Sequence, residues 1–391
     1  RTLSRDDAPE VRREAAFALG ILGHPDAVDP LVLRLHQEED VEATAEACLA
    51  LGRIGRADAA PYLHAMLASA YPRIREAAVE ALALLADSTS IGPLLQATRD
   101  SVPTVVWRAA YALEKVHDPS SHARLLELTR DEFELTRRYA IRSLGRIGAT
   151  AAAEAVAALA RPGEAHWQQR VRVADTLGRL DVLTPTVREC MAGLLDDSVF
   201  HVRVAALQAI GRARWEEFTE AVLALRSDPS ADVRAARLDA LAALDRTAHA
   251  EAFLDAYDDS SMVVRTTAIT HDGATATPAS RTRMLGFLGS EIARSVRMAA
   301  AQGLADAGET VRRTELEAML ADHDVFVATI AATALGERGE AGAAAALLRA
   351  SERTDDASGE LSRAVFTALG PIGDPVAIER LRRALTVETS T

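Results

Sequence analysis

Cysteine, lysine and aromatic residues are all scarce in this chain of 391 residues. Its two cysteines, Cys48 and Cys190, are too few for a disulfide framework or a cysteine-rich zinc site, so we expect a reducing, cytoplasmic compartment. Aromatic residues make up 4%, and Lys115 is the single lysine among 44 lysine and arginine residues. No run of 18 apolar residues occurs, which predicts that no helix spans a membrane.

The short motifs of common enzyme classes are also missing. The chain has no GxxxxGK[ST] phosphate loop, no GxGxxG before a helix and no HExxH, and its serine, histidine and aspartate residues are scattered. We therefore predict a protein that is not an enzyme, with no catalytic residue, no cofactor and no metal site.

What the sequence does contain favours a helical protein. Alanine, leucine and charged residues dominate, and apolar residues make up 49%, which is enough for a large core. The formal net charge of −13 argues against a whole-molecule preference for nucleic acid or an anionic membrane, although it allows a local basic patch.

The chain is an internal repeat. With the leucine of FALG as an anchor, equivalent positions recur every 31 to 34 residues in twelve repeats. The anchors are Leu19, Leu51, Leu82, Leu113, Leu144, Leu177, Ile210, Leu241, Asp272, Leu304, Leu335 and Leu369. Such a period predicts stacked two-helix units, in which a first helix with large apolar residues precedes a second helix that carries the anchor.

Other columns keep step with the anchor. An acid stands thirteen positions before it, at Asp6, Glu38, Asp100, Asp131, Glu164, Asp197, Asp228, Asp259, Glu291, Asp322 and Asp356. Arginine stands seven positions before it in eight repeats, and glycine often follows it. We expect the acid to cap the second helix, the glycine to end it, and the arginine to bridge to acids or carbonyls of an adjacent repeat.

The pattern D…VR..AA.ALG resembles the HEAT-like repeats of bilin-lyase type, along essentially the whole chain. The resemblance implies an all-α fold, a right-handed α-solenoid (superhelix) of about twelve stacked two-helix repeats, with the second helices on the concave face. It also implies a scaffold or a protein-binding surface. We expect one array over residues 1–391, a fragment that starts inside a repeat, with the tail of a first helix at residues 1–5 and a lone helix near 376–385.

Three columns of the second helix vary freely and share one helical face, at six and two positions before the anchor and two after it. The columns four and three before the anchor, and the anchor itself, are small or apolar and predict the core. In the fourth to seventh repeats, the variable columns and the adjoining Tyr139 supply the candidate binding residues: Trp107, Tyr111, Lys115, Arg138, Tyr139, Arg142, Arg146, Asp175, Arg179 and Arg212.

This set predicts a basic, aromatic-edged groove on the concave face that binds a partner protein or an acidic peptide segment. Two other functions stay open. A nucleic-acid groove like that of HEAT-like DNA glycosylases would use Trp107, Tyr111 and Asp175, and the repeat type alone also allows a protein like the bilin lyases or their chaperones. A purely structural interpretation is that the long side chains fill the inner curvature with solvated charges.

One repeat is irregular. Asp272 replaces the anchor leucine and His271 replaces the preceding alanine, and a charged residue at a core position is costly unless it is paired or exposed. We expect the helix to end early, near Thr270, and a loose joint over residues 270–280. A ligand site that uses His271 and Asp272 is the alternative.

Overall fold

The structure is a computed structural model, which describes residues 7–160, 166–290, 293–353, 355–356, 358–375, 378–379 and 382. Across these residues the chain is all-helical, with 23 α-helices, twelve short 3-10 helices and no strand. The predicted all-α fold of paired helices is confirmed. Contacts divide the chain into two compact units, an N-terminal unit (Arg1–Ala209) and a C-terminal unit (Ile210–Thr391), and the prediction of a single array stays a prediction.

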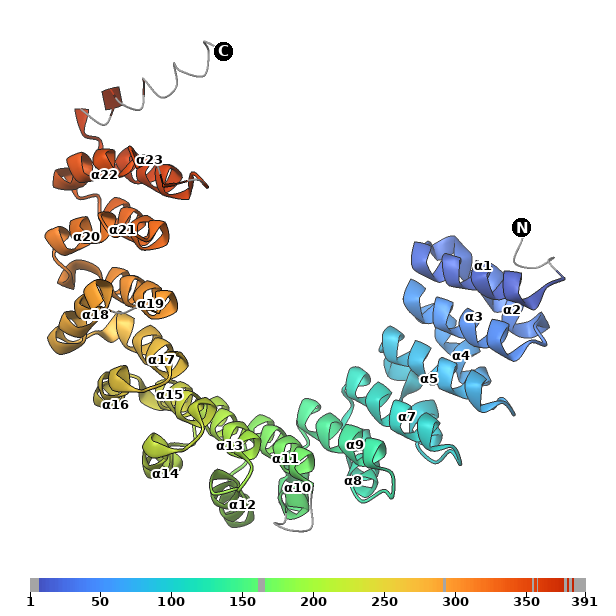
Figure 1. The fold of residues 1–391 in the computed structure, drawn as a ribbon. Helices are drawn as coiled ribbons and strands as arrows, with labels where there is room; N and C mark the ends of the chain where they lie inside the picture. The colour runs from blue at the N-terminus through green and yellow to red at the C-terminus, as the bar shows by residue number, and fades with distance from the viewer. Residues whose placement is uncertain are drawn as a thin grey trace. The chain divides into compact units, whose positions relative to one another are not determined.

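In the N-terminal unit, second helices and first helices alternate along the chain (Figure 1). The second helices are α1 (Pro9–Leu22), α3 (Val41–Ile54), α5 (Pro72–Leu85), α7 (Pro103–Val116), α9 (Glu134–Arg146) and α11 (Trp167–Leu180). The first helices are α2 (Val28–Gln37), α4 (Ala60–Met66), α6 (Ile91–Ala97), α8 (His122–Leu128), α10 (Ala153–Ala157) and α12 (Pro185–Leu195). Helix α13 (Phe200–Ala213) contains the point where the two units divide.

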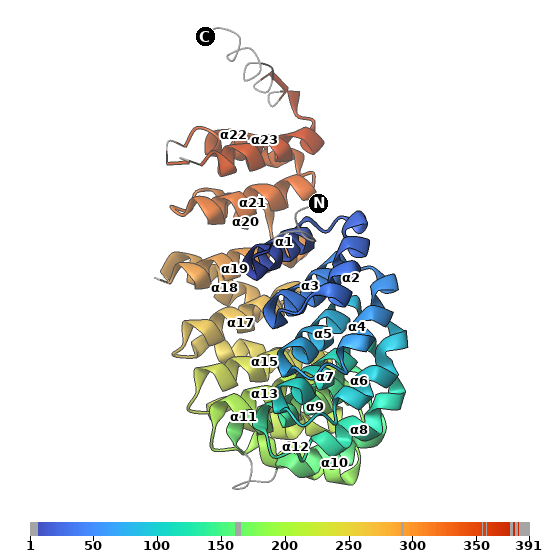
Figure 2. The same ribbon diagram turned by 90° about the vertical axis from the view of Figure 1, so that its right-hand side faces the viewer.

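The C-terminal unit repeats this alternation (Figures 1 and 2). Its second helices are α15 (Ala231–Asp245), α17 (Met262–Asp272), α19 (Arg294–Asp306), α21 (Val325–Glu337) and α23 (Glu360–Ile372). Its first helices are α14 (Thr219–Ala224), α16 (Ala250–Asp255), α18 (Pro278–Ser290), α20 (Arg313–Leu320) and α22 (Ala344–Ala350).

Short 3-10 helices introduce or end many of the first helices. They are η1 (Pro25–Ala27), η2 (Ala57–Ala59), η3 (Ser88–Ser90), η4 (Pro119–Ser121), η5 (Thr150–Ala152), η6 (Ala158–Ala160), η7 (Glu216–Phe218), η8 (Leu225–Ser227), η9 (Ala256–Asp258), η10 (Gly273–Thr275), η11 (Gly308–Thr310) and η12 (Ala341–Ala343).

The core lies between the two helices of each repeat and between successive repeats. The anchors Leu51 and Leu82 are fully buried, as are Leu63 and Leu94 of the first helices α4 and α6, which pack on α5 and α7. Each such leucine contributes about 1.5–3 kcal/mol by leaving water. Alanine fills the neighbouring columns, so successive second helices lie side by side and form one continuous layer within each unit.

The glycine after the anchor does not end the helix, contrary to the expectation from sequence. Helix α3 continues past Gly52 to Ile54, and Gly55 provides the left-handed C-cap with φ of 78°. A methyl group on Gly52 would lie 2.6 Å from the Cα atom of Ala81 in α5. The glycine column therefore serves the close approach of adjacent second helices.

The acid and arginine columns form the expected ladder between repeats. Arg75 of α5 donates from Nε and Nη2 to Asp100 of the next repeat, at 2.6 and 2.9 Å, and from Nη1 to the carbonyl of Ser69 at 2.9 Å. The same bidentate bond recurs in three more pairs, namely Arg12–Glu38, Arg170–Asp197 and Arg234–Asp259. The predicted structural role of these columns is confirmed.

The capping role of the acid needs a correction. Asp100 accepts the backbone N–H of Val102, which is the N-cap residue of α7, at 2.8 Å. Asp100 therefore orders the turn before the helix, whereas Asp356 of the same column accepts the N–H of Ser362, in the first turn of α23, at 2.8 Å and takes the expected capping role. The acids Asp6, Glu164 and Glu291, residues 1–5 and most of the proposed helix at 376–385 lie outside the described residues.

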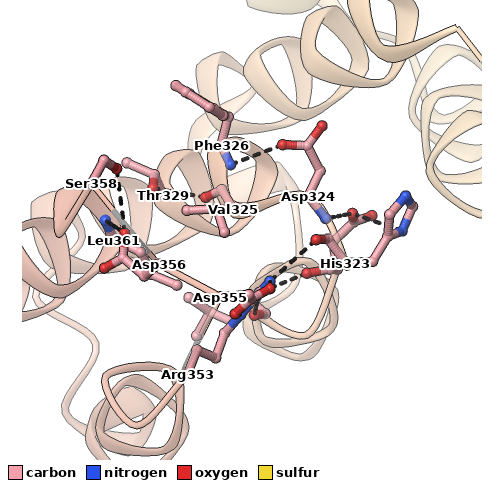
Figure 3. Close-up of polar contacts among 12 residues, drawn as sticks. His323, Asp324, Val325, Phe326, Thr329, Arg353, Asp355, Asp356, Ser358 and Leu361 are labelled. Atoms are coloured by element: carbon pink, nitrogen blue, oxygen red, sulfur yellow. Dashed lines mark hydrogen bonds and ion pairs between the residues drawn. The ribbon is translucent and has the colours of Figure 1, made fainter.

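Toward the C-terminus the ladder changes its partners, and Figure 3 shows Asp324 and Arg353 with some of their contacts. Arg297 reaches Asp324 at 3.3 Å, two residues beyond the acid column, and Asp324 also caps the N–H of Phe326. Arg353, which follows α22, donates to the carbonyl of Asp322 at 2.6 Å and to the carboxylate of Asp355. Arginine still joins adjacent repeats here, but from the loops as well as from the second helices.

The irregular repeat keeps its helix longer than its sequence predicts. Helix α17 continues to Asp272 and passes directly into η10, so the expected end near Thr270 is wrong, and the expected loose joint over residues 270–280 stays a prediction. Asp272 is fully buried, and its Oδ2 accepts a 2.9 Å hydrogen bond from the hydroxyl of Tyr257, while its Oδ1 finds no hydrogen-bond donor among the described residues. His271 instead contacts Asp239 of α15 at 2.7 Å, so the two residues do not form one site.

Candidate functional site

Helices α7 and α9 bring three aromatic rings together on the exposed face of the second-helix layer. Trp107 and Tyr139 stack with their centroids 5.0 Å apart, and the ring of Tyr111 meets Tyr139 edge-on at 5.6 Å. All three rings are half-buried, because Ala109, Ala110 and the other small residues of α7 occupy the inner face of the helix. The predicted outward position of Trp107 and Tyr111 is therefore what the structure has.

Cations cover the edges and faces of these rings. The Arg108 guanidinium lies 4.7 Å from the centroid of Trp107, and Lys115 lies 5.3 Å from that of Tyr111. Arg138 and Arg142 lie 5.2 and 5.8 Å from the centroid of Tyr139. Such contacts contribute about 0.5–1 kcal/mol each at an exposed site. We call the set Trp107, Tyr111, Lys115, Arg138, Tyr139 and Arg142 the aromatic–basic cluster.

A buried glutamate, Glu114, lies beneath the cluster. Its side chain is 2% exposed, and its carboxylate contacts Arg142 Nε at 3.0 Å and Arg146 Nε at 3.6 Å. Glu114 therefore offsets much of the positive charge of both arginines. Glu114 was not identified from the sequence. A signal for it exists in the sequence, since the column after the anchor holds glycine or alanine in the eleven other repeats.

Two cations of the cluster keep their charge uncompensated. In the described part of the chain, neither Arg138 nor Lys115 forms an ion pair with an acid. Burial lowers the pKa of the nearby Arg172, the positive charge of Arg138 lowers this pKa further, and the charge of Glu134 opposes both effects. The charge of Arg138 thus disfavours a neighbouring cation, and it would favour an incoming anion.

A pocket with about 500 Å³ of space adjoins the rings, between α5 and α7. Trp107, Tyr111, Lys115 and Tyr139 form one side, and Leu84, whose side chain is 54% exposed, lies on the other. Apolar and aromatic side chains, the cation of Lys115 and the ion pair of Arg108 with Glu80 line this pocket, so it suits an apolar side chain that is followed or preceded by an acid near Lys115.

The other candidate residues lie outside the cluster. Arg146 belongs to the Glu114 ion pair, and Asp175 and Arg179 pair with each other on α11 at 3.0 Å. Helix α9 stands between them and α7, so Asp175 does not join Trp107 and Tyr111. Arg212 is exposed on α13 in the C-terminal unit, so it is described apart from the cluster.

Some other kinds of site were sought in the described residues. Across the described ranges, no group of three or more histidine, cysteine, aspartate or glutamate side chains could hold a metal ion. Within the same ranges, no helix has both the length and the apolar character to cross a bilayer.

The repeats match the family model for HEAT repeats at residues 2–83, 61–134, 91–166, 123–211 and 219–305. The chain therefore belongs to the HEAT-repeat family, as the sequence pattern indicated. The helix pairs that follow residue 305 continue the same architecture without a match of their own.

Solved structures of similar fold include karyopherins. A Kap95:Nup1 complex aligns with a TM-score of 0.64 at 14% identity, over 95% of this chain and 60% of that one. Importin beta aligns with a TM-score of 0.62 at 14% identity, over 93% and 60%. The karyopherin Kap121p, bound to the extreme C-terminus of the protein phosphatase Cdc14p, aligns with a TM-score of 0.58 at 13% identity, over 99% and 50%.

These likenesses show a HEAT-repeat solenoid fold, and the sense of its superhelical winding stays a prediction. The chain spans about half the length of the Kap121p chains that it matches. A comparison with curated protein sequences gave no match.

Proposed function

We propose that this protein is a binding scaffold whose aromatic–basic cluster holds an acidic, extended segment of a partner protein. The observation that carries the proposal is the combination of three clustered rings with two cations, Lys115 and Arg138, that have no acidic partner in the described part of the chain. Aromatic and arginine side chains are enriched at the energetic centres of protein interfaces. Karyopherins of similar fold support it, because one of them was solved with the extreme C-terminus of a protein phosphatase.

The ring geometry favours a peptide over a nucleic-acid strand. Tyr139 stacks on Trp107, and the guanidinium of Arg108 also lies against the Trp107 ring. A nucleobase would have to displace one of these contacts before it could stack on Trp107. A peptide can instead place an apolar side chain in the pocket beside Leu84 and an acid near Lys115 or Arg138.

The test is a peptide selection on the purified chain, followed by affinity measurements with the double variant Lys115→Gln/Arg138→Gln. The selected peptides should be rich in aspartate and glutamate around one apolar residue. The double variant should bind them at least tenfold more weakly, because it removes the two uncompensated charges without exposing Glu114.

The matched control is Arg99→Gln/Arg130→Gln, which removes two exposed cations that follow the first helices α6 and α8. This control should bind the same peptides as tightly as the original chain does. Equal losses in both double variants would mean that only net charge matters, and no loss in the first would refute the proposed site. Tight binding of single-stranded oligonucleotides with a steep salt dependence, in place of peptide binding, would favour a nucleic-acid function.

A further inference from the structure

One position in the C-terminal unit breaks the rule of the core columns. Four residues before the anchor, the other eleven repeats hold alanine or valine. The repeat anchored at Leu241 holds Arg237 there. Because this column faces the interior of each repeat, a guanidinium at this position has to be compensated by a partner or by a ligand.

Arg237 is buried and lacks such a partner. Its side chain is 6% exposed, and its Nε–H finds no hydrogen-bond acceptor. Each of the other buried arginines, Arg34, Arg170 and Arg297, contacts a carboxylate, at 3.2, 2.6 and 3.3 Å respectively. Among the described residues, Arg237 is therefore the buried arginine that forms no ion pair.

The guanidinium lines a cavity with about 480 Å³ of space. The cavity lies beside α14, α15 and α16, wholly within the C-terminal unit, and its size falls in the range of about 300–1,000 Å³ that is usual for small-molecule sites. Arg226, Ser227 and His249 line it as well and add donors. Burial lowers the pKa of Arg237, and the charge of Arg226 lowers it further, against the opposing effect of Asp255.

Four acids also line the cavity, and they limit what it can accept. Asp259 is bound by Arg234, and Asp258 pairs with Arg283. Glu251 and Asp255 are exposed. The carboxylates on the cavity wall repel anions, most strongly a long polyanion such as nucleic acid, and the donors of Arg237 and Arg226 favour one small oxyanion against that repulsion.

We propose that this cavity is a binding site for a single phosphate-class oxyanion, held by the buried Arg237 and the exposed Arg226. The oxyanion would be inorganic phosphate or the phosphoryl group of a modified side chain. This site is independent of the aromatic–basic cluster, which lies in the other unit.

The test is calorimetric titration of the full chain with sodium phosphate, with ionic strength held constant by sodium chloride. We expect saturable binding of one phosphate per chain, at least tenfold weaker in Arg237→Ala. This substitution restores the residue type that the column favours, so the fold should tolerate it. The matched control Arg246→Ala, at an exposed arginine outside the cavity, should bind phosphate like the unmodified chain.

A second variant guards against misfolding of the first. Arg226→Gln changes an exposed residue and should weaken phosphate binding severalfold. A titration with O-phospho-L-serine distinguishes the two possible ligands. If it binds more tightly than inorganic phosphate, the ligand is a phosphorylated side chain. If it binds more weakly, the ligand is inorganic phosphate. No saturable phosphate binding, or equal binding by the original chain, Arg237→Ala and Arg226→Gln, would overturn the proposal.

Discussion

At the scale of single residues, the informative positions are those that break a column of small or apolar side chains. Glu114 follows an anchor where other repeats hold glycine or alanine, Arg237 replaces an alanine or valine, and Asp272 replaces a leucine. All three are buried, and the structure accommodates each of them in a different way. Glu114 pairs with arginines, Asp272 accepts a hydrogen bond from Tyr257, and Arg237 lines a cavity.

The role of Glu114 predicts two effects of opposite sign. Glu114→Gln removes the negative charge beneath the cluster, so acidic peptides should bind severalfold more tightly. The same change weakens the contacts to Arg142 and Arg146 and should lower the free energy of unfolding by about 1 kcal/mol, since both arginines are partly exposed. Peptide titration and urea denaturation measure the two quantities.

The control for this prediction is Glu127→Gln, which changes an exposed glutamate that pairs with Arg124 in the first-helix layer. It should leave peptide affinity unchanged. If Glu114→Gln instead weakened peptide binding, Glu114 would act by orienting Arg142, and the idea that it masks charge would be wrong.

At the scale of helices, the spacing of the second-helix layer depends on side chains that are missing. Gly52 meets the backbone of Ala81, and Gly178 meets that of Ala209, each with only 2.6 Å available to an added methyl group. The sequence placed these glycines at the right positions, but it gave them the wrong role, because a column of glycines near helix ends looks the same for a cap and for a close contact. Only the packing of the next repeat distinguishes the two.

One substitution made at two glycines should therefore have opposite effects. Gly52→Ala forces α3 and α5 apart and should destabilise the fold by about 1–3 kcal/mol. Gly92→Ala, in α6, meets no atom within 4 Å and should stabilise by up to about 1 kcal/mol through helix propensity. Urea denaturation of both variants measures the difference, and a stabilising Gly52→Ala would show that the helices can separate freely.

At the scale of the whole molecule, the sequence alone predicted the repeat, its two-helix content, the buried columns and the arginine ladder. It could do so because these features recur at a fixed period in most or all of the twelve repeats. The cluster was predicted only in part. The outward columns of α7 and α9 identified the rings and cations, but pairing by Glu114 depends on how one helix lies on the next, which no single column reveals.

The ladder also predicts how stability depends on pH. The pKa of Asp100 is lowered mainly by hydrogen bonds from Arg75, against the effect of burial, and those of Glu38 and Asp259 are lowered in the same way. Their folded-state pKa values thus lie below the unfolded values, near 4. The stabilisation is complete above those unfolded values and is lost as the pH falls through the folded ones, so urea midpoints should hold near neutral pH and fall steeply below about pH 4.

Arg75→Met tests one rung of the ladder. It should cost about 2 kcal/mol at pH 7, and the cost should shrink as the pH is lowered toward 2.5, because acid protonates Asp100 as the pH falls through its lowered pKa. Arg56→Met, at an exposed arginine paired with Asp58 within one loop, should change little at either pH. A cost of Arg75→Met that stays constant from pH 7 to pH 2.5 would assign the stabilisation to the carbonyl contact and to packing.

The ladder and the glycine contacts each join one repeat to the next, as Arg75 does with Asp100 and Gly52 with Ala81. The junctions between repeats are therefore arranged in series, and a pulling force along either compact unit would act on all of them. The weakest junction would open first and release one repeat of about 31 residues, or roughly 110 Å of extended chain, while its neighbours stay folded. Each unit would then yield in discrete steps and behave as an elastic element whose stiffness is set junction by junction.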